Sequence, residues 1–408
     1  MERQERWKRI LSLVALLALS GGPTPAADWP QWRGPNQDGI SQETGWLDRW
    51  PDQGPPVAWK ANVGLGFSSI VVAQGRAFTL GHADGQDSVV CLNADTGQEV
   101  WRHQYPADLG DKFYEGGTTG TPTVEGDRVF TLSRWGDAFC FESATGKIVW
   151  SKNVQKETGI RIPGWGFSGS PVVFKDLLLL NVGDAGLALE KATGKVVWKS
   201  EDKDAGYSTP LLFERGGEWY ALLGSAQSYV AVKPQTGQEA WRLKWLTQYG
   251  VNAADPILHG DRILLATGYG KGAGLFKMGS GEPESVWKSK VLRTQLNAAV
   301  RVGDYVYGVD GDTTARGALK CVEFATGTEK WTEPNVGSGG VIVAEGRLIV
   351  LSDRGELMVA PAVPDAFAPT ARAQILGGKF WTVPTLAHGR IYCRSSKGEI
   401  AAVDVRKK

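Results

Sequence analysis

The sequence has few of the residues that build metal, haem and redox sites. Its 408 residues include four cysteines and four histidines, and no two cysteines are adjacent. It contains no CxxC or CxxCH motif, which excludes the usual metal-type and haem-attachment patterns. The histidines are scattered along the chain, an arrangement that argues against a three-ligand zinc site. The sequence therefore predicts no metal site.

Neither sign of charge dominates, and recognisable catalytic motifs are missing. The 45 Lys and Arg residues balance 44 Asp and Glu residues, for a formal net charge of +1. No run of like charge breaks this balance, so the sequence predicts no binding to nucleic acid. The glycine-rich stretch at residues 268–274 matches neither the P-loop nor the dinucleotide pattern. Gly166-Phe167-Ser168-Gly169 lacks the spacing of a nucleophile elbow. No catalytic residue is predicted.

The N-terminus resembles a secretory signal peptide. A basic stretch that ends at Arg9 precedes an apolar run from Ile10 to Leu19, and small residues follow as far as Ala27. An apolar run of about ten residues is too short to span a bilayer, although an uncleaved anchor is the alternative. No cysteine follows the run, so lipid attachment is not expected. Residues 1–27 are predicted to be removed, which leaves a periplasmic or secreted protein without a transmembrane segment.

A repeat dominates the rest of the chain, which holds most of the 53 glycines and 17 tryptophans. A Thr-Gly turn is followed by a β-prone stretch that ends in tryptophan, as in Asp95-Thr96-Gly97 and Trp101. A period of about 40–50 residues with four β-like stretches is typical of a propeller blade. The recurring tryptophans are Trp59, Trp101, Trp150, Trp198, Trp241, Trp287 and Trp331.

Counting the first strand of each unit gives the number of blades. These strands begin near residues 69, 121, 170, 209, 255, 298, 340 and 383, which predicts eight blades. The last unit lacks its fourth strand, and a spare strand, Val57-Ala58-Trp59-Lys60, stands near the N-terminus. We therefore expect an all-β, eight-bladed propeller over residues 57–408, closed when the N-terminal strand completes the last blade. A leader at residues 28–56 precedes it.

These units resemble the PQQ-like (pyrroloquinoline quinone repeat) β-propeller superfamily, with its Ala-x-Thr-Gly-x-x-x-Trp consensus. The opening segment, residues 28–36, also resembles the leader before the first blade in that superfamily. The resemblance implies that each repeat tryptophan packs between neighbouring blades and is structural. Cys91, Cys140 and Cys321 each lie five residues before the Thr of their own turn, where other blades have Ala. They are expected to be buried free thiols.

Two classes of function follow from the resemblance. The chain resembles the non-catalytic BamB-type propeller of the outer-membrane β-barrel assembly machinery more than the quinoprotein dehydrogenases, because it lacks adjacent cysteines and long insertions. This implies a monomeric scaffold without a cofactor that binds protein partners or a small polar ligand. The missing lipid-attachment cysteine leaves its anchoring and its partner open. The alternative is a PQQ-dependent alcohol or sugar dehydrogenase that uses PQQ and Ca²⁺.

A binding face is predicted from the loops. The first-to-second and third-to-fourth turns are short and repetitive, whereas the second-to-third loops and the blade-to-blade crossings on the opposite face vary in length and chemistry. Variable loops on a rigid scaffold commonly carry function. The alternative is that their polar side chains only cap the channel and hold water. The candidate site residues are Trp165, Tyr207, Asn252, Asp255, Asn297, Asp310, Arg316, Lys379 and Trp381.

Overall fold

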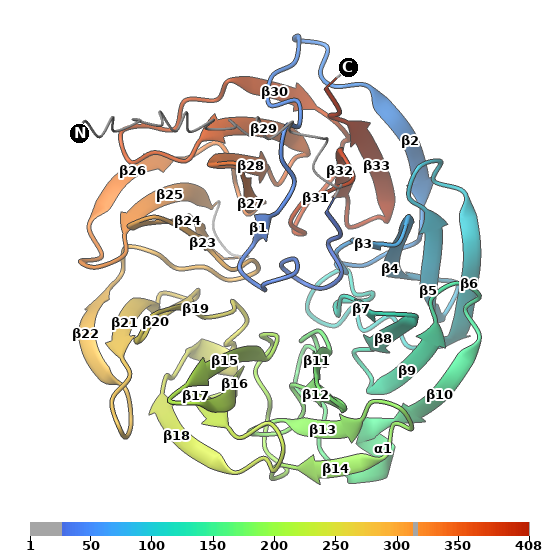
Figure 1. Cartoon of the computed structure of the whole chain (residues 1–408), viewed down its shortest axis with the longest axis vertical. Helices are drawn as coiled ribbons and strands as arrows, with labels where there is room; N and C mark the ends of the chain where they lie inside the picture. Colours follow the sequence, from blue (N-terminus) through green and yellow to red (C-terminus); the bar gives the residue numbers. More distant parts are fainter. Residues whose placement is uncertain (1–26, 313–316, 408) are drawn as a thin grey trace, which may run out of the picture.

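The chain forms a closed ring of eight β-sheets around a central axis, as a computed structural model shows (Figure 1). The structure describes residues 27–312 and 317–407. Each sheet is a blade of four strands, to which blade 7 adds one short strand. The colours of Figure 1 show that the blades follow one another in sequence order. This confirms the predicted all-β, eight-bladed propeller.

The blades are built as antiparallel meanders from the centre outward. Blades 1 to 4 consist of β3 (Val71–Ala73), β4 (Arg76–Ala83), β5 (Gln86–Asn93) and β6 (Glu99–Pro106); β7 (Thr123–Glu125), β8 (Arg128–Leu132), β9 (Asp137–Glu142) and β10 (Ile148–Asn153); β11 (Val172–Phe174), β12 (Leu177–Leu180), β13 (Leu187–Glu190) and β14 (Val196–Lys199); and β15 (Leu211–Arg215), β16 (Glu218–Gly224), β17 (Ser228–Val232) and β18 (Glu239–Lys244). Blades 5 to 8 consist of β19 (Ile257–His259), β20 (Arg262–Thr267), β21 (Gly272–Lys277) and β22 (Glu284–Ser289); β23 (Val300–Val302), β24 (Tyr305–Asp310), β25 (Ala318–Glu323) and β26 (Glu329–Glu333); β27 (Gly340–Ala344), β28 (Arg347–Leu351), β29 (Glu356–Pro361) and β30 (Ala371–Gln374); and β31 (Thr385–Ala387), β32 (Arg390–Arg394), β33 (Glu399–Asp404) and β2 (Val57–Asn62). The remaining elements are β1 (Ile40–Ser41), α1 (Val154–Thr158) and the 3₁₀ turn η1 (Gln248–Gly250). Among the described residues, no helix has the length and apolar character that crossing a membrane requires.

Strand β2 closes the ring. It pairs antiparallel with β33, and Trp59 lies opposite Ala402. The outer strand of blade 8 therefore comes from the N-terminal part of the chain, while its other three strands come from the C-terminal part. This confirms the predicted closure, which leaves no blade short of a strand.

The repeat tryptophans and the Thr-Gly turns contact each other across the seams between blades. The indole N–H of Trp101 donates a hydrogen bond of 3.0 Å to the carbonyl of Ser143, in the β9–β10 turn of the next blade. Gly146 in that turn has φ +71°, and a Cβ atom there would lie 2.6 Å from the ring of Trp101. The same two contacts recur between Trp59 and the Gly97 turn, Trp150 and the Gly194 turn, Trp198 and the Gly237 turn, and Trp287 and the Gly327 turn. Each of these glycines therefore leaves space for the indole of the preceding blade.

Three seams depart from this pattern: the outer strand of blade 7, β30, carries no repeat tryptophan, and the tryptophans of blades 4 and 6 each face a blade that lacks a Thr-Gly turn. Beyond Trp241, the degraded turn of blade 5 carries Gly279 and Gly281, and a Cβ atom on either would meet nothing within 4 Å. Trp331 instead donates to the carbonyl of Val363 at 2.9 Å and packs on Phe367, in the longer β29–β30 loop of blade 7. The seam contact thus depends on the receiving turn as much as on the tryptophan.

Three of the four cysteines lie directly opposite the repeat tryptophan of their own blade, and the fourth, Cys393, lies opposite Ala401. Cys91 is the cross-strand partner of Trp101, and Cys140 and Cys321 stand in the same relation to the tryptophans of their own blades. All four cysteines are buried and free. Burial raises the pKa of Cys91, Cys140 and Cys393 to about 12 and that of Cys321 to about 11, which keeps the thiols protonated.

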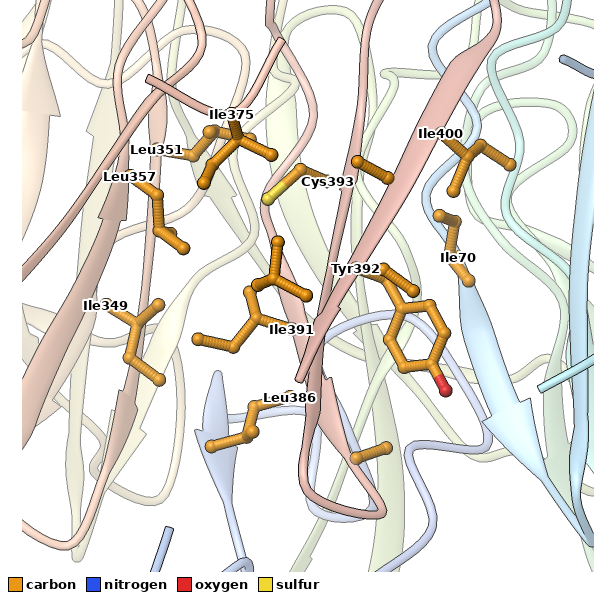
Figure 2. Close-up of a cluster of buried hydrophobic side chains, with 14 of the residues drawn as sticks. Ile70, Ile349, Leu351, Leu357, Ile375, Leu386, Ile391, Tyr392, Cys393 and Ile400 are labelled. Atoms are coloured by element: carbon orange, nitrogen blue, oxygen red, sulfur yellow. The ribbon is translucent and has the colours of Figure 1, made fainter. Parts of the chain in front are cut away.

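The apolar core lies between blades, so a middle strand such as β32 is buried on both of its faces. Figure 2 shows the seam of blades 7 and 8, where Ile349 faces Leu386 and Ile391. Tyr392, the next residue of the same strand, points the other way, toward Ile70 of blade 1. Alternating side chains of one strand therefore join both neighbouring blades, which makes the ring a rigid support for its loops.

The seam contact predicts a position-dependent effect of a single methyl group. Gly126, in the β7–β8 turn, has φ +55°, and a Cβ atom there would meet open space. Gly146 has φ +71°, and a Cβ atom there would meet the ring of Trp101. Both alanine variants meet the backbone strain of the left-handed region, but only Gly146→Ala must also displace an indole. We expect Gly146→Ala to lower the free energy of unfolding by about 1–3 kcal/mol more than Gly126→Ala. Denaturant melts of the two variants would measure this, and equal losses would contradict the seam assignment.

Candidate functional site

The leader, predicted over residues 28–56, crosses the centre of the ring before it reaches β2. In Figure 1 its first part, as far as β1, lies inside the inner strands, and the rest runs outward to the rim of the ring. Trp29 pairs with Val72 of blade 1 through two backbone hydrogen bonds of 2.7 and 2.9 Å. The leader then bonds to the inner edges of further blades, through Pro30 to Val124 of blade 2, Gln37 to Pro210 of blade 4, Arg33 to Ala299 of blade 6, Gly39 to Val343 of blade 7, and Ser41 to Leu386 of blade 8. The central channel is therefore filled by the chain's own N-terminal segment.

A belt of hydrogen bonds joins blades 1 to 5 just ahead of their inner strands. The N–H of Ser69 donates to Thr121 Oγ1 at 3.0 Å, and the N–H of Thr121 donates to Ser170 Oγ at 3.1 Å. The N–H of Ser170 donates to Thr209 Oγ1 at 3.1 Å, and the N–H of Thr209 donates to Asp255 Oδ1 at 2.7 Å. Each blade therefore bonds to the side chain at the equivalent position of the next blade. This explains why threonine, serine and aspartate precede the first-strand prolines.

A cavity of about 760 Å³ opens over this belt, a size typical of small-molecule sites. Most of its walls come from the crossings between blades. Its aromatic lining consists of Trp32, Phe67, Phe113, Tyr114, Trp165, Tyr207, Tyr249, Tyr269 and Trp381. Its hydroxyl-bearing lining consists, besides the tyrosines, of Thr119, Thr121, Ser168, Ser170 and Thr209. The cavity is thus an aromatic chamber whose base carries hydroxyl groups and the leader's Trp32.

One wall of the cavity is a shelf of three rings, defined as Phe113, Trp165 and Tyr249. The ring of Trp165 lies 5.2 Å from that of Phe113 and 6.4 Å from that of Tyr249. Phe113 is 55% exposed and Tyr249 is 65% exposed, so two rings of the shelf meet solvent. Tyr249 also has φ +64°, in the left-handed region that bulky residues rarely adopt. Strain and exposure of this kind are common at functional sites.

Another part of the wall is held by an ion pair between two crossings. Lys379, before blade 8, pairs with Glu115, before blade 2, and its ammonium lies 4.3 Å from the ring centroid of Trp381. The other neighbour of Trp381 is Phe67, which stacks on it at 5.3 Å. Partial burial works to raise the pKa of Glu115, but the hydrogen bond and charge of Lys379 outweigh it and lower that pKa. Glu115 therefore stays ionised and tied to its partner.

Asp255 is the buried charge of the cavity. Its Oδ2 accepts a hydrogen bond of 2.5 Å from the indole N–H of Trp32 and lies 4.0 Å from Arg33 Nε. Burial is the largest influence on this carboxyl and raises its pKa, while Arg33, Trp32 and the N–H of Thr209 oppose the rise. Burial likewise lowers the pKa of Arg33. The pair fixes the leader to the base of the cavity.

The structure brings together most of the site residues predicted from the sequence. Those that line the cavity are Trp165, Tyr207, Asp255, Asn297, Lys379 and Trp381. Asn252 is instead fully buried below the crossing before blade 5, where its amide donates to the carbonyls of Ser225 and Trp245. Asp310 is engaged by Arg293 and Lys320 at 2.8 and 3.1 Å. Arg316 lies outside the described residues. The binding role of the lining residues stays a prediction.

Several lining residues were not predicted, and they fall into two groups. Tyr249 lies on the same crossing as the predicted Asn252 and Asp255, whereas Phe67 and Phe113 lie on the crossings before blades 1 and 2, which carry no predicted residue. A search for aromatic side chains on every crossing would have found all three. Trp32 comes from the leader, and no pattern in the repeat indicates that it enters the channel. Its place depends on the path of the leader across the ring.

The donor set of the cavity does not resemble a metal centre. Within the described residues, no group of three or more His, Cys, Asp or Glu side chains lies close enough to hold a metal ion. Both oxygens of Asp255 accept hydrogen bonds from the protein. The arrangement is suited to binding by shape, ring contacts and hydroxyl groups.

Fold, seams and leader together define a PQQ-like, eight-bladed propeller. The chain matches the profile of the family described as outer membrane protein assembly factor BamB over residues 85–333 and 315–407, and it belongs to that family. The outer membrane protein assembly factor BamB of Burkholderia pseudomallei (strain K96243) is 28% identical over 314 residues, which cover 72% of this chain and 74% of the relative. This confirms the resemblance seen in the sequence.

Solved structures of a BamB protein and of a quinohemoprotein dehydrogenase share the architecture of this chain. BamB from Moraxella catarrhalis superposes with a TM-score of 0.63 at 15% identity, covering 86% of this chain and all (100%) of that one. Quinohemoprotein alcohol dehydrogenase from Comamonas testosteroni superposes with a TM-score of 0.69 at 15% identity, covering 93% of this chain and 81% of that one. At such identities the likeness shows the fold alone, and function has to be argued from the cavity.

The bond between Trp32 and Asp255 predicts a pH-dependent loss of stability in Trp32→Phe. Removing the N–H leaves a buried carboxylate oxygen without its donor, which should cost about 1–3 kcal/mol of unfolding free energy at neutral pH. Because this bond favours the ionised carboxyl, the loss should shrink as the pH falls and Asp255 becomes protonated.

The matched control is Trp135→Phe, which loses a bond of 2.7 Å from an indole N–H to the carbonyl of Asp108 at an exposed position. Its loss should be smaller and independent of pH in the acidic range. Urea melts over a pH series would compare the two, and parallel curves would contradict the role assigned to Trp32.

Proposed function

We propose that this chain is an exported, non-catalytic binding propeller of the periplasm or cell envelope. The face that carries the blade-to-blade crossings holds a protein partner or a small polar ligand. The observation that carries the proposal is the aromatic cavity of about 760 Å³, built by crossings on a closed ring. Preformed apolar cavities with a few placed polar groups are typical binding sites. The Burkholderia relative is named as an assembly factor, which also fits a protein that acts by binding.

Export and a monomeric state belong to the same proposal. The signal peptide proposed for residues 1–27 lies almost entirely outside the described residues, and its basic and apolar stretches support export. Since β2 completes blade 8 within the chain, the ring needs no second copy to be whole. Cleavage near Asp28 would leave the leader intact, because its ordered contacts begin with residues 27–29.

A PQQ-dependent dehydrogenase is the second candidate, and the cavity does not fit it. The resemblance to those enzymes would call for adjacent cysteines, a Ca²⁺ site and a catalytic aspartate. The four cysteines lie in different blades, and Asp255 is held by Trp32, Thr209 and Arg33. Lys379, the cavity's exposed cation, is paired with Glu115. Lys379 and Asp255 are thus already engaged within the protein, which disfavours binding of a quinone carboxylate by the one and of a calcium ion by the other.

We therefore predict that the purified protein takes up no stoichiometric PQQ when PQQ and Ca²⁺ are added. Calorimetric titration should give no saturable heat, and a dye-linked assay with alcohols and sugars should show no oxidation above that of the buffer. Tight uptake of one PQQ per chain would overturn the non-catalytic proposal and restore the dehydrogenase.

The binding face can be tested by photo-crosslinking in cells. We expect p-benzoylphenylalanine in place of Phe113, at the mouth of the cavity, to form adducts with whatever the cavity holds. The matched position is Trp219, an aromatic residue of β16 that is 37% exposed beside the β15–β16 turn, on the opposite face. Protein adducts would appear as gel shifts, and small ligands as increments in the intact mass.

Adducts at residue 113 and none at residue 219 would support the proposed face. Adducts at residue 219 alone, or at neither position, would contradict it. Both replaced residues are at least one-third exposed aromatic side chains, so the comparison does not depend on rebuilding the core.

A further inference from the structure

The base of the cavity offers hydroxyl protons. Thr121, Ser170 and Thr209 line it, and the oxygen of each already accepts a main-chain N–H from the preceding blade. Within the described residues, none of these three hydroxyls donates a hydrogen bond of its own. They therefore form a row of uncharged donors, fixed in position by the belt. A ligand that lies against this row needs acceptor oxygens at regular intervals.

Asn297 adds the complementary group. Its amide nitrogen donates to the carbonyls of Gly339 and Trp381, each at 3.1 Å. Both of its N–H groups are thus used within the protein, which fixes the amide orientation and leaves the side-chain oxygen to accept. The cavity consequently offers donors from the belt and an acceptor from Asn297.

The charges that line the cavity are balanced within the protein. Glu115 pairs with Lys379, and Asp255 is matched by Arg33. A cationic ligand would find each carboxylate already occupied, and an anionic ligand would find Lys379 engaged. Moving a charged group out of water without an available partner is costly. The electrostatics therefore favour a neutral ligand.

The shelf formed by Phe113, Trp165 and Tyr249 supplies flat apolar faces at the mouth. The face of an aromatic ring carries negative charge density and attracts polarised C–H groups. A pyranose ring has such C–H groups on its faces and hydroxyl oxygens around its edge. A pyranose therefore combines flat C–H faces with closely spaced oxygens that both donate and accept hydrogen bonds.

We propose that the cavity binds a segment of a neutral oligosaccharide, with sugar faces on the shelf and sugar oxygens on the row of Thr121, Ser170 and Thr209. This inference rests on the proposed binding function and specifies its ligand class. The oligosaccharide can be free or attached to a protein, since the mouth beside Phe113 and Tyr249 is open to solvent.

Titration calorimetry on the full mature protein tests the ligand class. The probes are neutral oligomers of glucose, mannose and galactose, anionic oligomers of galacturonic acid, cationic oligomers of glucosamine, and an uncharged peptide containing tryptophan and tyrosine. We expect at least one neutral oligomer to bind, and its charged counterparts to bind about tenfold more weakly or not at all. Affinity for the neutral oligomer should not change between low and high salt, because no net charge is exchanged.

Three variants locate the contact. Tyr249→Ala and Phe113→Ala remove exposed rings of the shelf, and each should weaken binding up to about tenfold, the upper range for one ring contact. Trp219→Ala removes an exposed ring on the opposite face and should leave affinity unchanged. Thermal melts serve to confirm that all three variants are folded.

The inference is overturned if no neutral oligomer binds, if a charged oligomer or the peptide binds more tightly, or if Trp219→Ala weakens binding as much as Tyr249→Ala. In each of these cases the crosslinking result decides the broader proposal separately. Adducts at residue 113 that carry no sugar would leave the binding face established and remove only the oligosaccharide.

Discussion

An indole ring lying against a glycine, with its N–H bonded to a carbonyl of the same turn, joins most of the neighbouring blades. Trp101 and Gly146 show the arrangement, in which the ring takes the space that a Cβ atom would need. Burying an indole contributes several kcal/mol, roughly in proportion to its apolar area. Because the contact repeats from blade to blade, the ring is held at its outer strands, and its inner strands can begin with polar residues without loss of cohesion.

The cavity depends on this arrangement, in which the outer strands hold neighbouring blades together. The outer strands supply the seams, so the residues ahead of the inner strands are free to form the belt from Ser69 to Asp255. The belt aligns the crossings, and the crossings carry the aromatic walls. The leader completes the base, because Arg33 and Trp32 meet the only carboxylate of the belt. A buried charge thus helps to fix the position of the leader, whose short strand β1 also pairs with β27 of blade 7.

The sequence predicted the fold well because its signals are local. The Thr-Gly turn and its tryptophan lie within a few residues of each other, and β7 begins at Thr123, two residues from the start predicted at 121. The closing strand could also be predicted, because the last repeat unit lacks its fourth strand and residues 57–60 form a strand outside any unit.

The site was only partly predictable, since side-chain direction is set by tertiary packing. Asp255 and Asn297 could be found because they depart from the repeat at positions next to the channel. Asn252 was predicted from its place on a neighbouring crossing, but its amide turns inward to the carbonyls of Ser225 and Trp245. Trp32 carries no signal at all, because the route of the leader depends on bonds to strands far along the chain.

The position of β2 has a consequence for how the molecule is made. This strand leaves the ribosome early, yet its only partner, β33, contains residues 399–404. Nearly the whole chain must be synthesised before the first β-strand of the propeller can pair. Until then, β2 has no strand partner, although Trp29 and Trp59 can already contact Val72 and Ala94 of blade 1. Contacts so distant in sequence form slowly, so we expect the pairing of β2 with β33 to be a late step of folding.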